Sequence, residues 1–117
     1  MTASESAAAS KIFPMLSCRD LARSRALYED LLGGVETFRF PDDGEPAFVA
    51  LRIGESSEIG LGGIAQAPLH GRPQRPAAGH RIELCVYVDD VDAVFARARH
   101  RGFEAVAEPA DMVWGER

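Results

Sequence analysis

Residues 18–34 read CRDLARSRALYEDLLGG, and this stretch decides the fold. Asp20 stands immediately before a run whose apolar residues recur at helical spacing, and Gly33 and Gly34 follow that run. An aspartate side chain accepts hydrogen bonds from the first free amides of a helix, and glycine readily adopts the left-handed conformation that ends one. The pattern therefore predicts a helix over residues 21–32.

The same arrangement returns in the second half of the chain. In the run that begins at His80, HRIELCVYVDDVDAVFARARHRG, Asp90 aligns with Asp20, and the alignment continues without a gap through the strand-like residues before it. A glycine, Gly102, again ends the helical pattern, which predicts a second helix over residues 91–101. An internal repeat of this length indicates two copies of one supersecondary unit.

Short runs of β-branched and aromatic residues between turn signals predict the strands. Pro14 lacks a backbone donor, so the first strand is expected at the margin of a sheet. The turn cluster PDDGEP is expected to join the second and third strands as a hairpin. The predicted strands cover residues 11–18, 35–40, 47–53 and 56–63 in the first unit, and 82–88 and 103–109 in the second.

The two units predict an α+β fold of tandem βαβββ modules within one domain. The chain divides into a flexible tail (1–10), a first module (11–63), a proline-rich linker (64–80) and a second module (81–117). A second module as long as the first would run past Arg117, so its last strands are missing from the 117 residues. Two explanations stay open: a tail follows Arg117, or a partner chain completes the sheet.

Composition narrows the class of protein. The net charge of −5 disfavours a nucleic-acid partner, which needs a basic surface. No stretch has the ~18 apolar residues of a membrane span, and the start MTASESAAAS does not resemble a secretory signal, so we expect a cytoplasmic protein without a membrane partner. Cys18 and Cys85 fall in strand-like runs and are expected to be buried, reduced thiols.

Residues 18–34 and the run VYVDDVDAVFARARHRGFEAVAEP (86–109) resemble the two module signatures of the vicinal oxygen chelate superfamily. That superfamily includes glyoxalase I, extradiol dioxygenases, fosfomycin-inactivating enzymes and bleomycin-resistance proteins. The resemblance covers the chain from Lys11 onward and implies a glyoxalase-like fold, in which curled sheets form a cavity and the helices pack outside. Because this scaffold hosts isomerases, oxygenases, transferases and drug binders, it does not by itself imply one activity.

Metal-dependent members of the resembled superfamily carry a histidine seven residues before the first helix cap, where this chain has Phe13. The corresponding second-module position is Glu83, the fourth-strand position is Gly60 with Glu58 on the same face, and the final glutamate has no counterpart. The histidines do not align with ligand positions: His70, His80 and His100. A metal site needs at least three convergent donors, so we expect neither a metal nor another cofactor.

Strand alternation sorts the remaining side chains by face. Either Phe38 and Phe40 or, in the other register, Thr37 and Arg39 face the cavity. The resemblance places Trp114 over the pocket mouth. The candidate ligand-binding residues are Phe13, Met15, Phe38, Phe40, Phe48, Arg52, Glu83, Cys85, Tyr87 and Trp114. Aromatic side chains in a concave site stack on flat ligands, but the same side chains could fill the interior as core. A buried Arg52 would need Glu83 or a polar ligand as partner.

Three functions remain open. The first is metal-independent binding and sequestration of an aromatic small molecule or antibiotic, as in bleomycin-resistance-like proteins. The alternative is a glyoxalase-like lyase or isomerase or a dioxygenase-type enzyme, against which Phe13 argues, and no catalytic residue is assigned. The third is a module without a ligand. The resemblance also implies a homodimer that holds its ligand in grooves between subunits.

Overall fold

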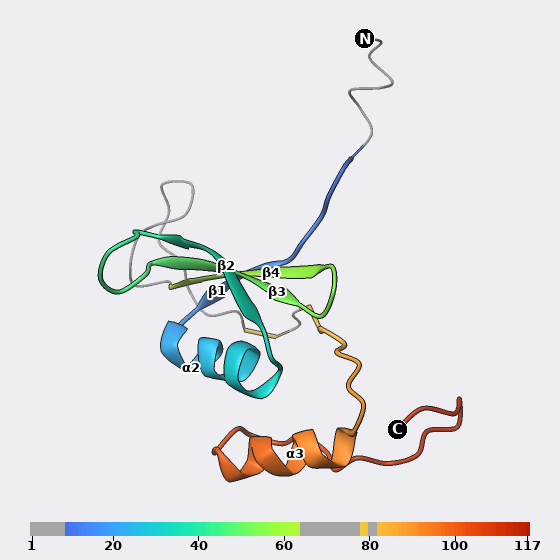
Figure 1. Cartoon of the computed structure of the whole chain (residues 1–117). Helices are drawn as coiled ribbons and strands as arrows, with labels where there is room; N and C mark the ends of the chain where they lie inside the picture. Colours follow the sequence, from blue (N-terminus) through green and yellow to red (C-terminus); the bar gives the residue numbers. More distant parts are fainter. Residues whose placement is uncertain (1–8, 64–77, 80–81) are drawn as a thin grey trace.

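The computed structural model describes residues 9–63, 78–79 and 82–117. One sheet carries a helix against one of its faces, and a second helix lies beyond the first, on the side away from the sheet (Figure 1). The strands lie in the order β1-β4-β3-β2, with β1 parallel to β4 and the other neighbours antiparallel. Their bounds are β1 (Met15–Cys18), β2 (Val35–Phe40), β3 (Phe48–Ile53) and β4 (Ser57–Gly63). The sequence therefore predicted every strand of the first module, and the chain has the mixed α+β architecture of a glyoxalase-like fold.

The first predicted helix is confirmed as α2 (Leu21–Arg25), which continues directly into the π-helical η1 (Ala26–Leu31). Asp20 Oδ1 accepts a hydrogen bond from the Arg23 amide at 3.1 Å, and Gly33 ends the helix with a φ of 73°. Gly34 then turns tightly against η1, because a Cβ there would lie 2.6 Å from the Tyr28 carbonyl oxygen. The cap at Asp20 fixes where the helix begins, and the two glycines turn the chain from its end into β2.

The core lies between the sheet and α2–η1. Val49, Leu51 and Leu61 are fully buried, and Cys18 and Ile59 are nearly so. The half-buried residues Leu16, Leu21, Tyr28 and Ile53 pack against this cluster. Burial of each such side chain contributes about 1.5–3 kcal/mol, so the first module holds most of the apolar stabilisation described.

A β-bulge in β2 decides which side chains face away from the helix. The pairing between β2 and β3 shifts between Glu36 and Phe38, and the bulged Thr37 donates its hydroxyl to the Ala50 carbonyl. Phe38 then lies opposite Ala50 and Phe40 opposite Phe48, which are residues of the helix-free face. The alternative register, with Thr37 and Arg39 on that face, is wrong, because Arg39 lies opposite the buried Val49.

The second module follows the prediction only in its helix. The helix α3 (Val91–His100) forms behind its Asp90 cap, but residues 82–88 and 103–109 form no strand, so both of those predictions are wrong. A strand needs a neighbouring strand to bond with, and β1 is already paired with β4. Consequently, the described residues contain no second sheet, and α3 packs on η1 instead of on strands of its own.

Two smaller differences concern the first module and the linker. β1 begins at Met15, not at Lys11, because Pro14 has no amide to donate to β4 and contributes only its carbonyl, to the Gly60 amide. Most of the predicted tail and linker lies outside the described residues. None of the described helices has the length and apolar character needed to cross a membrane.

Candidate functional site

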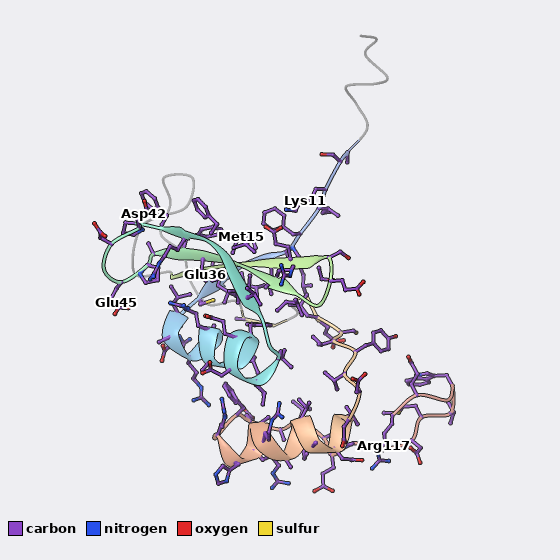
Figure 2. All side chains as sticks on the ribbon, in the orientation of Figure 1. Lys11, Met15, Glu36, Asp42, Glu45 and Arg117 are labelled. Atoms are coloured by element: carbon purple, nitrogen blue, oxygen red, sulfur yellow. The ribbon has the colours of Figure 1, made fainter. Side chains whose placement is uncertain are left out.

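The sheet face opposite α2 and η1 carries the candidate site, which we call the open face. It is defined by Met15, Phe38, Phe40, Phe48 and Arg52, with Glu58 and Gly60 of β4 between them. Figure 2 shows Met15 and Lys11 on this side of the sheet, with α2 on the other. The side chains of Met15, Phe38 and Phe40 are 44%, 55% and 63% exposed. The open face is thus an apolar surface and not a packed core.

Aromatic and thioether groups form the centre of the open face. The rings of Phe38 and Phe48 lie with centroids 5.9 Å apart and planes inclined by 57°. Gly60 allows Met15 and Phe48 to approach each other across β4, because a Cβ at Gly60 would meet Met15 Sδ at 2.6 Å and Phe48 Cε2 at 3.1 Å. Any larger residue at Gly60 would separate these two side chains.

Charged groups lie at one end of the open face. Lys11 pairs with Glu58, and its ammonium lies 5.3 Å from the centre of the Phe13 ring. Arg52 is exposed and has neither a hydrogen bond nor an ion pair with the described residues, so its charge is solvated. Of the two partners expected for a buried Arg52, Glu83 is not in contact with it, and the exposed guanidinium is open to a polar ligand.

Four predicted site residues do not join the open face. Glu83, Cys85 and Tyr87 lie in the extended segment before α3, and all three are exposed because that segment has no strand partner. Cys85 is consequently not the buried thiol that the sequence predicts, whereas Cys18 is. Trp114 donates its indole N–H to Glu116 at 3.0 Å within the C-terminal turn.

With this geometry in place, comparisons with known proteins establish the family. A sequence model of the Glyoxalase/Bleomycin resistance protein/Dioxygenase superfamily matches residues 12–117. The chain belongs to this superfamily. No curated protein matches the chain in sequence.

Solved structures of the superfamily share the fold. A member from Sphaerobacter thermophilus matches with a TM-score of 0.65 and 19% identity over 92% of this chain and 83% of its own. TioX from Micromonospora matches with a TM-score of 0.63 and 22% identity, over 91% of this chain and 84% of its own. A lactoylglutathione lyase from Agrobacterium tumefaciens matches with a TM-score of 0.58 and 22% identity, over 92% of this chain and 81% of its own. At these identities the likeness shows the fold alone.

The residues present do not fit the metal site of metal-dependent superfamily members. Phe13 has no lone pair to donate, Glu58 is neutralised by Lys11, and Glu83 lies off the sheet in the extended segment. The described residues contain no group of three His, Cys, Asp or Glu side chains placed to hold one ion. We therefore derive no chemistry through a metal.

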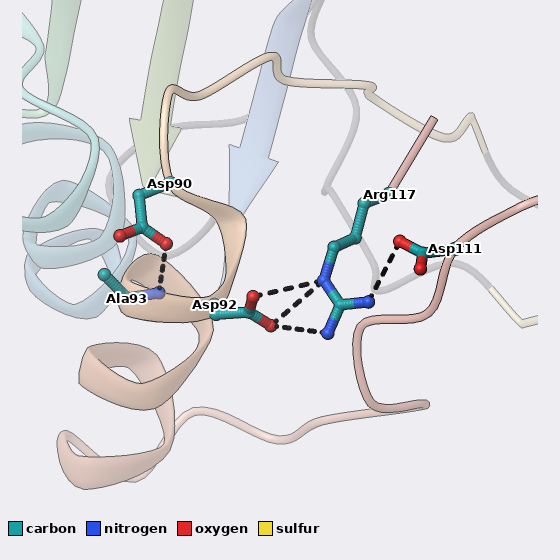
Figure 3. Close-up of polar contacts among 5 residues, drawn as sticks. All are labelled: Asp90, Asp92, Ala93, Asp111 and Arg117. Atoms are coloured by element: carbon teal, nitrogen blue, oxygen red, sulfur yellow. Dashed lines mark hydrogen bonds and ion pairs between the residues drawn. The ribbon is translucent and has the colours of Figure 1, made fainter. Parts of the chain in front are cut away.

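Arg117 forms a clamp with two aspartates that sequence motifs do not reveal. Arg117 contacts both carboxylate oxygens of Asp92, the nearest at 3.0 Å, and it binds Asp111 at 3.1 Å (Figure 3). These bonds raise the pKa of the Arg117 guanidinium. A groove of about 400 Å³ lies between this clamp and residues 86–92. No motif signals the clamp, because Asp92 belongs to α3 and Asp111 to the irregular segment after it.

Proposed function

We propose that this chain binds a flat aromatic small molecule on the open face and does not transform it. The observation that carries the proposal is the Phe38–Phe48 pair, which stands beside Met15 and remains accessible to solvent. Contiguous apolar surface of this kind is uncommon on a soluble protein and marks a binding site. A planar ligand laid on these rings would cover the surface that the helix leaves bare.

The strength of such binding follows from the contacts available. A stacked aromatic pair contributes about 0.5–1.5 kcal/mol beyond its buried area. Two or three such contacts, together with the apolar area covered, are compatible with micromolar affinity, about −8 kcal/mol. Arg52 is solvated on the same face and can orient a carboxylate, phenolate or carbonyl group of the ligand. A homodimer in which both copies bind ligand is part of this proposal.

The alternative is an enzyme of the glyoxalase-like lyase, isomerase or dioxygenase type. The superfamily includes such enzymes, and a lactoylglutathione lyase is among the structures of similar fold. The residue set of the open face argues for binding, because its polar members are the Lys11–Glu58 pair and the solvated Arg52. Cys85, the candidate nucleophile, lies in the extended segment away from that face.

Binding and turnover can be separated in one titration. We would add flavins and planar aromatic antibiotics to the protein, follow ligand fluorescence, and analyse the recovered ligand by mass spectrometry. Phe38→Ala is expected to weaken binding about tenfold, because it removes one side of the ring pair. Phe103→Ala is the matched control, because Phe103 packs under the Arg23 guanidinium, outside the open face.

Two results would contradict the proposal. Chemically altered ligand, produced over many turnovers per chain, would favour the enzyme. Equal affinity of the Phe38→Ala and Phe103→Ala variants would show that the ligand binds elsewhere.

A further inference from the structure

Arg52 lies beside the aromatic rings of the open face. On β3 it stands two residues after Ala50, and Phe38 of β2 lies opposite Ala50. Diagonal neighbours of this kind in a sheet are about 7–8 Å apart, which long and aromatic side chains can span. A planar ligand stacked on Phe38 can therefore carry a substituent to the Arg52 guanidinium.

The cross-strand neighbour of Arg52 is a carboxylate, yet the two side chains do not pair. Glu58 of β4 lies directly opposite Arg52, and opposed residues have Cβ atoms only about 4.5–5.5 Å apart. The Glu58 carboxylate instead accepts a hydrogen bond from the Lys11 ammonium. Arg52 has no hydrogen bond or ion pair with the described residues. Because Lys11 holds Glu58, the guanidinium of Arg52 keeps its donors for a ligand.

The open face carries a net positive charge, although the chain as a whole is acidic. The charged residues of the described strands are Glu36 and Arg39 on the helix side, and Arg52 and Glu58 on the open face. Lys11 reaches Glu58 from the segment before β1, so two positive charges and one negative charge gather there. The net charge of the chain is −5. Salt screens exposed charges beyond about 8 Å, so a ligand on the open face experiences chiefly these three groups.

We propose that the open face selects an aromatic anion, an aromatic carboxylate in particular, and that the Lys11–Glu58 pair sets this preference by keeping Arg52 unpaired. This preference rests on the aromatic binding proposed above and names the class of ligand. A guanidinium presents its donors in a fork that matches the two oxygens of a carboxylate. A neutral carboxamide offers one acceptor oxygen, and a cation is repelled. Arg52 contacts the ligand, whereas Lys11 is a positioning residue that acts through Glu58.

Loss of Lys11 changes what Arg52 meets on the open face. Without its ammonium partner, the Glu58 carboxylate pairs with the guanidinium opposite and competes with the carboxylate of the ligand. Removal of Glu58 together with Lys11 leaves Arg52 unpaired again and returns the face to its original net charge. The effects of the two substitutions on ligand affinity should therefore cancel, whereas independent effects would add.

Two probes of one shape separate charge selection from stacking. A naphthalene carboxylate and the corresponding naphthalene carboxamide share a ring system and differ in charge. Each is titrated into the 117-residue chain, with binding followed by ligand fluorescence. The carboxylate is expected to bind about tenfold more tightly, because its hydrogen bonds to the guanidinium are charge-assisted. Arg52→Gln is expected to remove this preference by lowering the affinity for the carboxylate.

The role of the ion pair is tested by a cycle of substitutions. Lys11→Gln is expected to weaken binding of the carboxylate about threefold or more, and Glu58→Gln in the same chain is expected to restore it. Arg99→Gln is the matched control on α3. Arg99 also pairs with a glutamate, Glu108 at 3.4 Å, and its guanidinium lies 5.7 Å from the centre of an aromatic ring. This control should leave the affinity for both probes unchanged, and circular dichroism checks that each variant is folded.

The possible failures are distinguishable. Equal affinity of the parent chain for the carboxylate and the carboxamide would overturn the anion preference and leave aromatic binding intact. Binding of neither probe would contradict the aromatic binding itself. A preference that survives Arg52→Gln would overturn the role of Arg52. A loss in Lys11→Gln that Glu58→Gln does not restore would overturn the role of the ion pair, since Lys11 would then act on the ligand directly.

Discussion

The two modules begin in the same way and end differently. Asp20 caps α2 with φ and ψ of −126° and 95°, and Asp90 caps α3 with −129° and 93°. Each carboxylate accepts a hydrogen bond from the amide three residues on, at 3.1 and 3.0 Å. Yet the first module has four strands and the second has none among the described residues. A helix is specified by its own residues, whereas a strand also requires a neighbour.

The forces that hold the two modules differ accordingly. The first buries a continuous apolar cluster, whereas no residue of α3 is buried. Module two is attached by polar contacts: Arg97 donates to the Leu31 carbonyl at 3.0 Å, and Arg23 donates to the Gly102 carbonyl at 2.7 Å. The Arg23 guanidinium also lies 4.4 Å from the centre of the Phe103 ring. The exposed contact of Arg23 with the Phe103 ring contributes about 0.5–1 kcal/mol, well below the burial of a core side chain.

One valine in each module gives the sharpest contrast. Val49 is fully buried and Val106 is 99% exposed. Val49→Ala is expected to lower the free energy of unfolding by about 2 kcal/mol, because it removes two buried methyl groups and leaves a cavity. Val106→Ala should change it by less than about 0.5 kcal/mol. Urea unfolding followed by circular dichroism measures both, and similar losses would contradict the difference between the modules.

Removing either helix cap should destabilise its own helix equally, but only removal of the Asp20 cap should destabilise the core. Replacing either aspartate with alanine removes one capping bond, which costs a helix about 1 kcal/mol. Asp20→Ala should lower the unfolding free energy of the first module, because α2 covers the core. Asp90→Ala should instead loosen α3 alone, seen as faster hydrogen exchange of the Val94 amide and later α3 amides. A fall in the midpoint of core unfolding with Asp90→Ala would show that α3 and the core unfold together.

The same contrast explains what the sequence could predict of the fold. Both helices and the four strands of module one follow from caps, turns and alternation, which are local signals. The strand predicted over residues 82–88 failed because alternation shows that a segment can pair, not that a partner is present. The bulge at Thr37 could not be predicted either, because it arises from the register between β2 and β3. The sequence therefore left open whether Phe38 and Phe40 face the cavity.

The shared face of five first-module candidates was predicted from the sequence, whereas their role in ligand binding stays a prediction. Met15, Phe38, Phe40, Phe48 and Arg52 share one face, as alternation predicts once the bulge is counted. The second-module candidates were assigned to the same surface by the repeat, and their segment is not in the sheet. Their part in binding stays a prediction.

The two tyrosines of the chain, one in each module, extend the comparison to pH. Burial beneath the sheet raises the pKa of Tyr28, whereas a hydrogen bond to Glu116 raises the pKa of the exposed Tyr87. Tyr87→Phe and Tyr28→Phe each leave one phenol to titrate by its near-ultraviolet absorbance. Glu116→Gln should lower the Tyr87 pKa toward its ordinary value of about 10 and leave that of Tyr28 unchanged.

The consequence for stability separates the two groups further. Because the folded pKa of Tyr28 lies above its unfolded value, its contribution is fully present below pH ~10 and is lost as the pH rises through the folded pKa. The free energy of unfolding of the parent chain should therefore fall across that alkaline window. The fall should be smaller in Tyr28→Phe, because phenylalanine keeps the ring but has no proton to lose. Tyr87→Phe should reduce this loss by less, because Tyr87 is solvent-exposed and water weakens its hydrogen bond to Glu116. Equal effects of the two substitutions would contradict this difference in burial between Tyr28 and Tyr87.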